Sequence, residues 1–573
     1  MFKHQLFNSV NRSRQLIIQF ISLFCLCCFL VISCSQPQNN PNNTSTAEIQ
    51  TNRITIGTTL KPRTVDPADA YEVISGNLLY NLGDRLYGYK LGTTELVPNL
   101  LYNLGDRLYG YKLGTTELVP QLATEMPKIS EDGITYTIPI RQGVTFHDGT
   151  PFNSEAMAFS LKRFIENEGP PSSLLANTVE SVEATGEYQL TIKLKKPFAA
   201  FTPLLAFSGL CAVSPQAYTI DENKFKPDTF IGTGPYKLVE YSTDVLRLDI
   251  FDNYWGEKPQ NQGIDIQIFS SSANLFNAFK TGAIDVAYLS LDTDQISNLE
   301  QESERQGWQV ISTDGKTVNY IVLNINSAPL DNKAVRQALA AIVDRNLLNK
   351  RVLREQAEPI YSLIPNKFEG YKPVFQENYG DGNFDKSKEL LKEAGHSQDN
   401  PAKIEIWYAS NSTKRQLVAS TLKASVEEKI DGLMELELNS VEAATAFKNL
   451  DKGLYQTFML DWYGDFVDAD NYIQPFLECT KGSEETGCEA GASQFQGSFY
   501  YSDRINQLIE EQRQEQNPEK RQDIFREIQD LLGEDVPFIP LWLDKDYVFA
   551  QKNINGVNLE PTQQFPFWTI NKS

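Results

Sequence analysis

Histidine is scarce in this chain, and its scarcity excludes several kinds of catalytic centre. The 573 residues include three histidines, of which only His147 and His396 lie beyond the N-terminal leader. These two are far apart and lack partners at metal-ligand spacing, which excludes a histidine-based metal cluster and a Ser-His-Asp triad. Gly232-Thr233-Gly234 lacks the third glycine of a nucleotide-binding loop, and no Walker A motif is present. We therefore predict no catalytic residue, no metal site and no cofactor.

Positive charge and long apolar runs are also in short supply. Lys and Arg number 52 against 74 Asp and Glu, so the formal net charge is -22. Nucleic acid and anionic lipid headgroups repel so acidic a body. Beyond the leader no apolar stretch approaches membrane-spanning length. These deficits exclude a nucleic-acid-binding protein, a channel and a permease.

The leader has the order of an export signal. Basic residues precede an apolar run from Leu16 to Ile32, and Ser33 stands directly before Cys34. This ending resembles a bacterial lipoprotein signal, in which Cys34 becomes the lipidated first residue of the mature protein. The alternative is an uncleaved membrane anchor, although so short a run would barely span a bilayer.

We accordingly predict a signal peptide over residues 1–33 and a flexible tether over 34–51. The tether is rich in Asn, Gln and Pro and cannot bury apolar surface. The expected location is the periplasmic side of the cell envelope, with the lipid as the only link to the membrane.

Three of the seven cysteines lie beyond the leader and its cleavage site. Cys479 and Cys488 bracket a polar turn, and outside the cytoplasm such a pair is expected to form a disulfide. Closing so short a loop would contribute roughly 2–3 kcal/mol at most. The alternative is two unrelated thiols. Cys211 stands among apolar neighbours and is interpreted as a small buried side chain.

Strand-like and helical segments alternate along the chain, which predicts α/β lobes. The chain is too long for one core, so two or three lobes are expected. A break is predicted near Gly315 to Asn319, with a return crossing near Leu541 to Asp546. The resulting boundaries are lobe I over residues 52–315, with 544–573 returning to it, and lobe II over 316–543.

Residues 77–98 are repeated without change as residues 99–120. Two copies are too few for a solenoid, so an in-frame duplication or an error in the gene sequence is the simpler interpretation. We expect one copy to occupy the native site and the other to be accommodated outside the core. Because the copies are identical, the sequence does not distinguish them.

Four segments in a fixed order carry a resemblance to a known family. The segments are Arg141 to Phe152 with the residues before it from Leu122, Gly232 to Tyr236 leading to Trp255, Leu323 to Leu339, and Asp461 to Tyr472. Together they resemble the peptide-type solute-binding proteins of ABC importers, the oligopeptide, dipeptide and nickel group. The match extends along essentially the whole mature chain, and the duplicated segment is the clear departure from it.

The resemblance implies an α/β, two-lobed periplasmic-binding-protein-like fold with mixed sheets and a cleft closed by a hinge. In peptide-binding members the carboxylate that matches Asp465 holds the α-ammonium group of the ligand. Trp462, Tyr463 and Gly464 are its expected neighbours in the cleft, although core packing is an equal alternative for the two aromatic residues. Asp465 itself has the alternative of a solvated loop acid or a helix cap.

The predicted function is therefore capture of peptides between two lobes and delivery to an ABC permease. The expected partners are a peptide ligand and the permease subunits, with no nucleic acid, and the protein is expected to be a monomer. Alternatives are a nickel complex or an oligosaccharide in the same fold, an exported hydrolase, and a purely structural envelope protein. The scarcity of histidine weakens the metal version, and the missing nucleophile–base pair weakens the hydrolase.

Overall fold

One large mixed sheet organises the protein. In this computed structural model the described residues are 52–89, 118–221, 224–560 and 565–573. Residues Asn52–Ser573 form one compact unit. The sheet has 11 strands in the order β15-β14-β16-β12-β19-β11-β1-β10-β9-β8, and β13 pairs with β19 outside this path. Its strands are β1 (Ile54–Thr58), β8 (Tyr236–Tyr241), β9 (Val245–Ile250), β10 (Ile264–Ile268), β11 (Val286–Tyr288), β12 (Gln309–Leu323), β13 (Ala357–Pro359), β14 (Ala402–Ala409), β15 (Met434–Val441), β16 (Thr457–Trp462) and β19 (Phe538–Ala550).

The sheet is mixed, as expected. Strand β1 is parallel to β10 and β11, and β14 is parallel to β15 and β16, whereas β12 is antiparallel to β16 and β19. Parallel pairs need crossover connections, which the alternation of strands and helices supplies.

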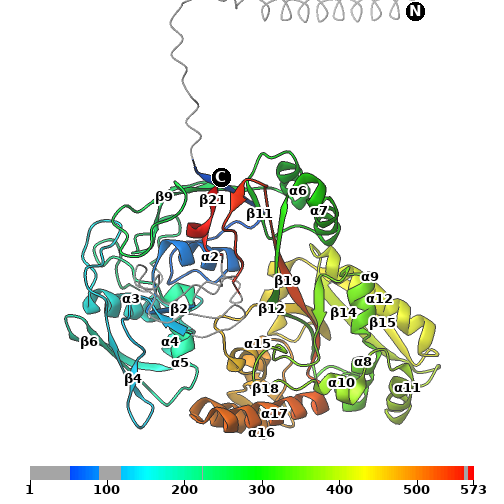
Figure 1. The fold of residues 1–573 in the computed structure, drawn as a ribbon. Helices are drawn as coiled ribbons and strands as arrows, with labels where there is room; N and C mark the ends of the chain where they lie inside the picture. Colours follow the sequence, from blue (N-terminus) through cyan, green and yellow to red (C-terminus); the bar gives the residue numbers. More distant parts are fainter. Residues whose placement is uncertain (1–51, 90–117, 222–223, 561–564) are drawn as a thin grey trace, which may run out of the picture. The chain divides into compact units, whose positions relative to one another are not determined.

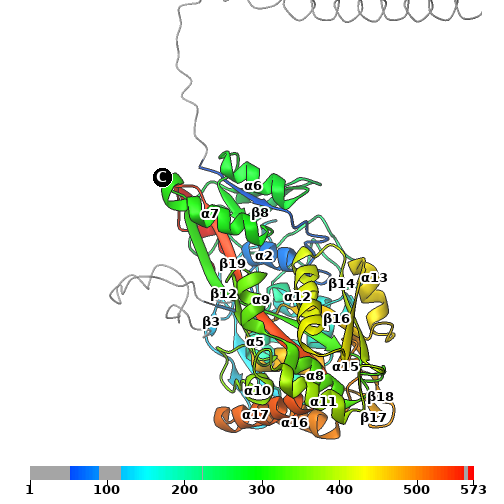
Figure 2. The same cartoon turned by 90° about the vertical axis from the view of Figure 1, so that its right-hand side faces the viewer.

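Strands β12 and β19 are longer than the sequence indicates. The sequence predicts a break near Gly315 to Asn319 and a crossing near Leu541 to Asp546, but β12 runs from Gln309 and β19 continues to Ala550 without ending at either place. They pair with each other along almost their full length, with a register shift between Asp314 and Val318. In Figures 1 and 2 they run side by side through the middle of the molecule. Polar residues interrupt the apolar alternation at the centre of each strand, so the sequence pattern does not indicate that the strands are continuous.

The buried apolar residues form separate clusters on either side of this crossing. The largest cluster draws only on residues from Val318 to Leu543. The other clusters use residues 54–299 and 548–570, and also Phe466. We refer to these two parts as lobe II and lobe I, respectively. The exact boundaries at 315/316 and 543/544 stay a prediction.

Helices cover the sheet in both lobes. Those of lobe I are α2 (Val73–Leu82), α3 (Ser154–Glu166), α4 (Ser173–Ala176), α5 (Phe201–Leu204), α6 (Ser272–Lys280) and α7 (Thr293–Gln306). Those of lobe II are α8 (Lys333–Ile342), α9 (Arg345–Arg351), α10 (Val374–Tyr379), α11 (Phe384–Glu393), α12 (Thr413–Lys429), α13 (Ala443–Leu450), α14 (Gln474–Leu477), α15 (Ala492–Phe495), α16 (Asp503–Gln514) and α17 (Pro518–Asp535). Short 3₁₀ turns are η1 (Ser208–Leu210), η2 (Ala469–Tyr472) and η3 (Phe567–Thr569). The Asn517 side chain caps α17 by accepting from the Lys520 amide, and Pro518 takes the first helical position, where its missing N–H costs nothing.

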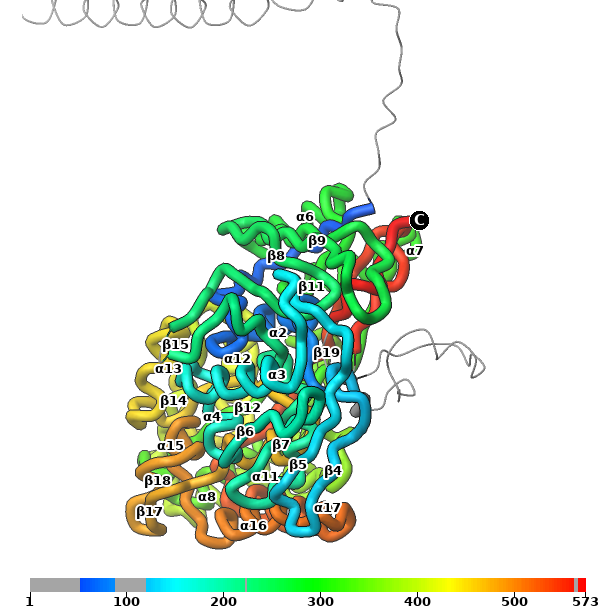
Figure 3. The backbone as a smooth tube through the Cα atoms, turned by 90° about the vertical axis from the view of Figure 1, so that its left-hand side faces the viewer, coloured from blue at the N-terminus to red at the C-terminus, as the bar shows by residue number. Residues whose placement is uncertain are grey.

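Smaller sheets complete the architecture. Lobe I carries a four-stranded sheet in the order β4-β5-β7-β6 (Figure 3). Its strands are β4 (Lys128–Ile129), β5 (Thr135–Pro139), β6 (Val179–Gly186) and β7 (Gln189–Leu194). Two-stranded sheets are formed by β2 (Tyr87–Tyr89) with β3 (Leu118–Pro120), β17 (Lys481–Ser483) with β18 (Gly487–Ala490), and β20 (Ile554–Asn555) with β21 (Asn571–Lys572).

The duplicated segment contributes to the fold from both copies. Helix α2 and strand β2 include residues of the first copy, whereas β3 belongs to the second, and β2 pairs antiparallel with β3. This two-stranded sheet therefore combines the two copies, and the expectation that one copy alone fills the site does not describe it. Identical sequences allow this, because either copy of the second strand presents the same residues to the first. Residues 90–117 lie outside the described residues.

Two further expectations concern cysteines and the membrane. Cys479 and Cys488 are joined by a disulfide, and Cys211 is buried with a free thiol. The leader, Cys34 and the tether lie outside the described residues. Among the helices that the structure describes, none is long and apolar enough to cross a membrane.

Candidate functional site

The loop that follows β16 forms the centre of the site. Residues Thr457–Leu460 of this strand are buried between β12 and β14, and the chain leaves the sheet at Trp462. The loop then folds back onto η2. A Cβ on Gly464 would lie 2.6 Å from the Tyr472 hydroxyl oxygen, so only glycine allows this approach. A buried strand thus presents Trp462 to Asp465 at its carboxyl end, where crevices of α/β sheets open.

Asp465 is held by hydrogen bonds from both lobes. Its amide donates to the Asn471 Oδ1 at 2.7 Å, and the Asn471 Nδ2 donates to its Oδ2 at 3.4 Å. The Tyr71 hydroxyl donates to the same Oδ2 at 3.1 Å from the segment before α2 in lobe I. The carboxylate therefore joins residues that are 394 positions apart.

A cavity of about 280 Å³ surrounds this carboxylate. Trp462, Tyr463, Gly464 and Asp465 all line it, so the structure places the four predicted residues in one cavity. The opposite wall comes from lobe I, through the start of α2 and the segment around η1. The residues of that wall are Ala70, Tyr71, Glu72, Val73, Gly76, Asn77, Ala206, Phe207 and Ser208.

Asp465 has an unusual electrostatic environment. Burial raises its pKa to about 6, and the hydrogen bonds from Asn471 and Tyr71 only partly oppose the rise. No cationic side chain of the described residues contributes to this balance. The ionised carboxylate therefore lacks a countercharge within the ranges that the structure describes.

Other acids near the cavity do have cationic partners. Asp461 forms an ion pair with Arg415. Glu72 pairs with Arg63 at 2.8 Å, and Asp468 pairs with Arg521 at 2.7 Å. Asp465 differs from these neighbours, and a ligand cation could supply what it lacks.

The two predicted aromatic residues have different roles. Trp462 lines the cavity and also packs on the core of lobe II, since its ring lies 5.5 Å from that of Phe476. Its Nε1 donates to the Asn471 carbonyl oxygen at 2.9 Å. Tyr463 lines two cavities, and burial raises the pKa of its hydroxyl. Both expectations, cleft wall and core packing, thus apply to Trp462.

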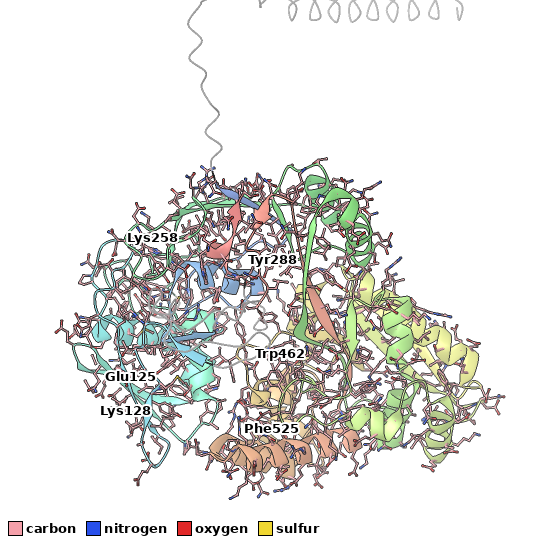
Figure 4. All side chains as sticks on the ribbon, viewed as in Figure 1. Glu125, Lys128, Lys258, Tyr288, Trp462 and Phe525 are labelled. Carbon is pink, nitrogen blue, oxygen red and sulfur yellow. A yellow bond between two sulfur atoms is a disulfide. The ribbon has the colours of Figure 1, made fainter. Side chains whose placement is uncertain are left out.

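Two more cavities continue the first one in opposite directions. A cavity of about 460 Å³ is lined by Tyr288 and Asp546 and shares Asp461 and Tyr463 with the first. Another, of about 550 Å³, includes Phe525 and shares Val467. In Figure 4, Tyr288, Trp462 and Phe525 follow one another down the middle of the molecule. The three cavities therefore form one cleft along the loop after β16.

The same loop also reaches into lobe I. Phe466 is 6% exposed and packs in a lobe I cluster with residues such as Leu86 and Ala206. Val467 packs against that cluster as well. The loop that presents Asp465 is thus fixed at both sides of the cleft.

Sequence reasoning missed the lobe I wall. Tyr71, Phe207 and Tyr288 stand in segments without a functional motif, and Tyr71 follows an Asp-Pro turn that is a weak signal by itself. Only the fold brings them opposite Asp465. The disulfide residues Cys479 and Cys488 line none of the three cavities. Among the described ranges, no group of three or more His, Cys, Asp or Glu residues could hold a metal ion.

Comparison with known proteins places this geometry in a family. Residues 117–484 match the family model described as bacterial extracellular solute-binding proteins, family 5 Middle. The glutathione-binding protein GsiB of Salmonella typhi is 26% identical over 459 residues, which cover 77% of this chain and 83% of GsiB.

Solved structures share the fold. The periplasmic binding protein DppA of Helicobacter pylori, in complex with the peptide STSA, matches with a TM-score of 0.71 and 22% identity, over 91% of this chain and 98% of DppA. NikA of Brucella suis, in complex with Fe(III)-EDTA, matches with a TM-score of 0.75 and 19% identity, over 91% of this chain and all of NikA. The expected two-lobed α/β fold with mixed sheets is confirmed, as is the resemblance of the four segments. The chain therefore belongs to the bacterial extracellular solute-binding proteins of family 5.

Proposed function

We propose that this protein captures peptides with a free N-terminus in the cleft and delivers them to an ABC import permease. The observation that carries the proposal is Asp465, a shielded carboxylate in a cavity between the lobes with no cationic partner among the described residues. An ammonium group would donate a charge-assisted hydrogen bond there, worth about 1.5–3 kcal/mol.

The named ligands of relatives support a peptide. GsiB is a glutathione-binding protein, and DppA was solved with STSA; glutathione and STSA are both peptides. The row of cavities offers length for an extended chain on either side of Asp465. The proposed function includes no chemical step on the ligand.

We propose that the lobes close around the ligand. Two contacts that cross the cleft support this, since Tyr71 donates to Asp465 and Phe466 packs into lobe I. A ligand ammonium on Asp465 would add a further link at the same place. Strands β12 and β19 cross between the lobes and provide the hinge.

The direct test compares peptides with free and acetylated N-termini by calorimetry at pH 7.5. Acetylation should weaken binding to the wild-type protein roughly 10- to 100-fold, and Asp465→Asn should no longer distinguish the two ligands. Asp461→Asn is the matched control, because it removes the same charge from the same cavity wall. It should retain the discrimination. Equal binding of both peptides to the wild type would remove Asp465 from this role.

Mass spectrometry of copurified ligand tests the ligand class independently. A peptide is expected. A metal complex or an oligosaccharide in the cleft would contradict the peptide proposal while leaving the family unchanged.

We also propose that Cys34 carries the lipid that anchors the protein to the membrane. The support is the basic, apolar and small-residue order before this cysteine. Cells that produce Cys34→Ser should release the protein from the membrane fraction or retain it unprocessed, without incorporation of labelled fatty acid. Equal labelling of the variant and the wild type would contradict the proposal.

A further inference from the structure

A contact between the two lobes lies outside the cleft. Gln356 stands in the turn between α9 and β13, is 7% exposed, and has its neighbours Leu353 and Ala357 in the core of lobe II. Its Nε2 donates to the Thr293 carbonyl oxygen and to the Ser297 hydroxyl oxygen, each at 2.9 Å. Both acceptors are residues of α7, which packs in lobe I. One buried side chain of lobe II is thus bonded twice to a helix of lobe I.

The turn that carries Gln356 has an unusual backbone. Arg354 and Glu355 have φ values of 52° and 64°, in the left-handed region that residues other than glycine rarely adopt. Such a backbone persists only where the surroundings hold it. Strand β19 does so, since the Lys545 amide donates to the Gln356 carbonyl oxygen at 3.3 Å and the Lys545 Nζ donates to the Glu355 carbonyl oxygen at 3.4 Å. The Gln356 side chain therefore reaches α7 from a turn that is fixed on a hinge strand.

The contact and the cleft lie on opposite sides of the crossing strands. In Figure 1, α7 and α9 lie to the right of β12 and β19, whereas α2, whose start lines the cavity of Asp465, lies to their left. Gln356, Thr293 and Ser297 line none of the three cavities described above. A ligand in those cavities therefore does not touch them.

This placement couples the contact to the lobe angle. A rotation about β12 and β19 that changes the width of the cleft also changes the separation of Gln356 from α7. Hydrogen bonds weaken steeply when their distance or angle departs from the ideal. The two bonds of Gln356 therefore favour the lobe angle of this structure. It is also the angle at which Tyr71 meets Asp465 across the cleft.

An ion pair next to Gln356 joins the same two elements but is exposed. The Arg354 Nη2 lies 2.5 Å from the Asp294 Oδ1, and the two side chains are 52% and 72% exposed. Water and salt screen such a pair, so its contribution is small. The hydrogen bonds of the buried Gln356 are not screened in this way. Most of the stabilisation at this contact is therefore assigned to Gln356.

We propose that Gln356 is a positioning residue for ligand capture, because its two hydrogen bonds to α7 hold the lobe angle at which the cleft binds its ligand. It strengthens the binding of every ligand of the cleft by the same factor and touches none of them. Loss of the two bonds shifts the lobes away from the binding angle and lowers the apparent affinity. The proposal rests on the proposed function and adds a determinant of affinity outside the binding surface.

The test measures alanine peptides of two to five residues, with free and with acetylated N-termini, by calorimetry. Gln356→Met removes both hydrogen-bond donors and keeps the length of the side chain. Ser297→Ala removes one acceptor and is the milder second variant. Arg354→Ala is the matched control, since it removes the exposed ion pair from the same turn. The double variant of Gln356→Met and Ser297→Ala completes a cycle, and thermal unfolding without ligand establishes that each variant is folded.

Gln356→Met should weaken the binding of free and acetylated peptides by the same factor, about 5- to 30-fold, and leave their ratio at the wild-type value. Ser297→Ala should weaken both by a smaller common factor. The double variant should bind like Gln356→Met, because the first change already removes both bonds. Arg354→Ala should stay within about twofold of the wild type.

The outcomes separate this inference from the proposed function. Wild-type affinity in folded Gln356→Met overturns the inference, as does tighter binding, and the role of Asp465 then stands. A changed ratio of free to acetylated peptide in Gln356→Met would mean that the residue acts on the ligand, which also overturns it. So would additive losses in the double variant, or an equal loss in Arg354→Ala. A wild type that binds no peptide overturns both proposals.

Discussion

Asp66 and Asp465 are two shielded carboxylates with different surroundings, because only Asp66 has a cationic partner among the described residues. Asp66 is fully buried in lobe I. Its two carboxylate oxygens accept hydrogen bonds from the two terminal nitrogens of Arg163, each at 2.7 Å. The amides of Ala68 and Lys226 donate to it as well. Asp465 lies in the cleft with hydrogen bonds from Tyr71 and Asn471, and no cation of the described part of the chain pairs with it.

The difference separates structural from functional charge. A buried ion pair with complete hydrogen bonding stabilises one arrangement of the chain, whereas an unpaired charge in a cleft is a cost that a ligand can remove. Lys316 belongs with Asp465 in this comparison, because its ammonium group also lacks a partner among the described residues. Asp465 and Lys316 both line cavities of the cleft.

The largest expected effect concerns the paired acid. Asp66→Asn leaves the Arg163 guanidinium buried without its countercharge, and the free energy of unfolding should fall by about 3–5 kcal/mol. Urea denaturation at pH 7 measures the change. A loss below about 1 kcal/mol would break the distinction between structural and functional acids.

A smaller effect of opposite sign is expected for the unpaired cation. Lys316→Met should raise the free energy of unfolding by about 1–3 kcal/mol near pH 7, because it removes a buried charge without a partner. The pKa of Lys316 is lowered to about 7 in the folded protein, so the unfolded chain binds more protons between that value and its ordinary pKa. The contribution of Lys316 to the free energy of unfolding of the wild type therefore falls as the pH falls from about 10 to 7.

The stability gap between Lys316→Met and the wild type should accordingly widen over that fall in pH. Denaturation curves at several pH values measure this difference. Lys367→Met is the control, and its stability should keep the pH dependence of the wild type. Destabilisation by Lys316→Met at every pH would show that the ammonium group has a structural partner.

The smallest effect is the pH dependence of ligand binding. Asp465 has a pKa of about 6 without ligand, so below that pH it is neutral and loses its attraction for an ammonium group. The α-amino group of a peptide stays charged over this range. Affinity for a free-amine peptide should therefore be about tenfold lower at pH 5 than at pH 7. Asp465→Asn should show a flat profile by calorimetry, and a flat wild-type profile would argue against an ionic contact.

Much of the site was predictable because its motif is contiguous. The segment from Asp461 to Tyr472 follows a buried strand, and its resemblance to the family motif singled out Trp462, Tyr463 and Asp465, which line one cavity. The proximity of Cys479 and Cys488 was also a local matter, since nine positions separate them. The remaining wall came from distant segments that carry no signal of their own.

The fold shows the same division. Alternating apolar patterns predicted the individual strands and helices, yet not that β12 and β19 continue through polar residues such as Asp314 and Lys545. Pairing between the two strands holds these residues in extended form. The two-stranded sheet of β2 and β3 likewise joins residues from the two identical copies, which local sequence could not decide.

The sequence by itself determined the family, the α/β character and the acid that lines the cleft, because each depends on short motifs and local patterns that can be recognised one segment at a time. The tertiary structure alone decided which charges have partners. Asp66 meets Arg163 across 97 positions, whereas Asp465 is placed against the neutral side chains of Tyr71 and Asn471. A countercharge depends on distance in space, and only folding sets that distance.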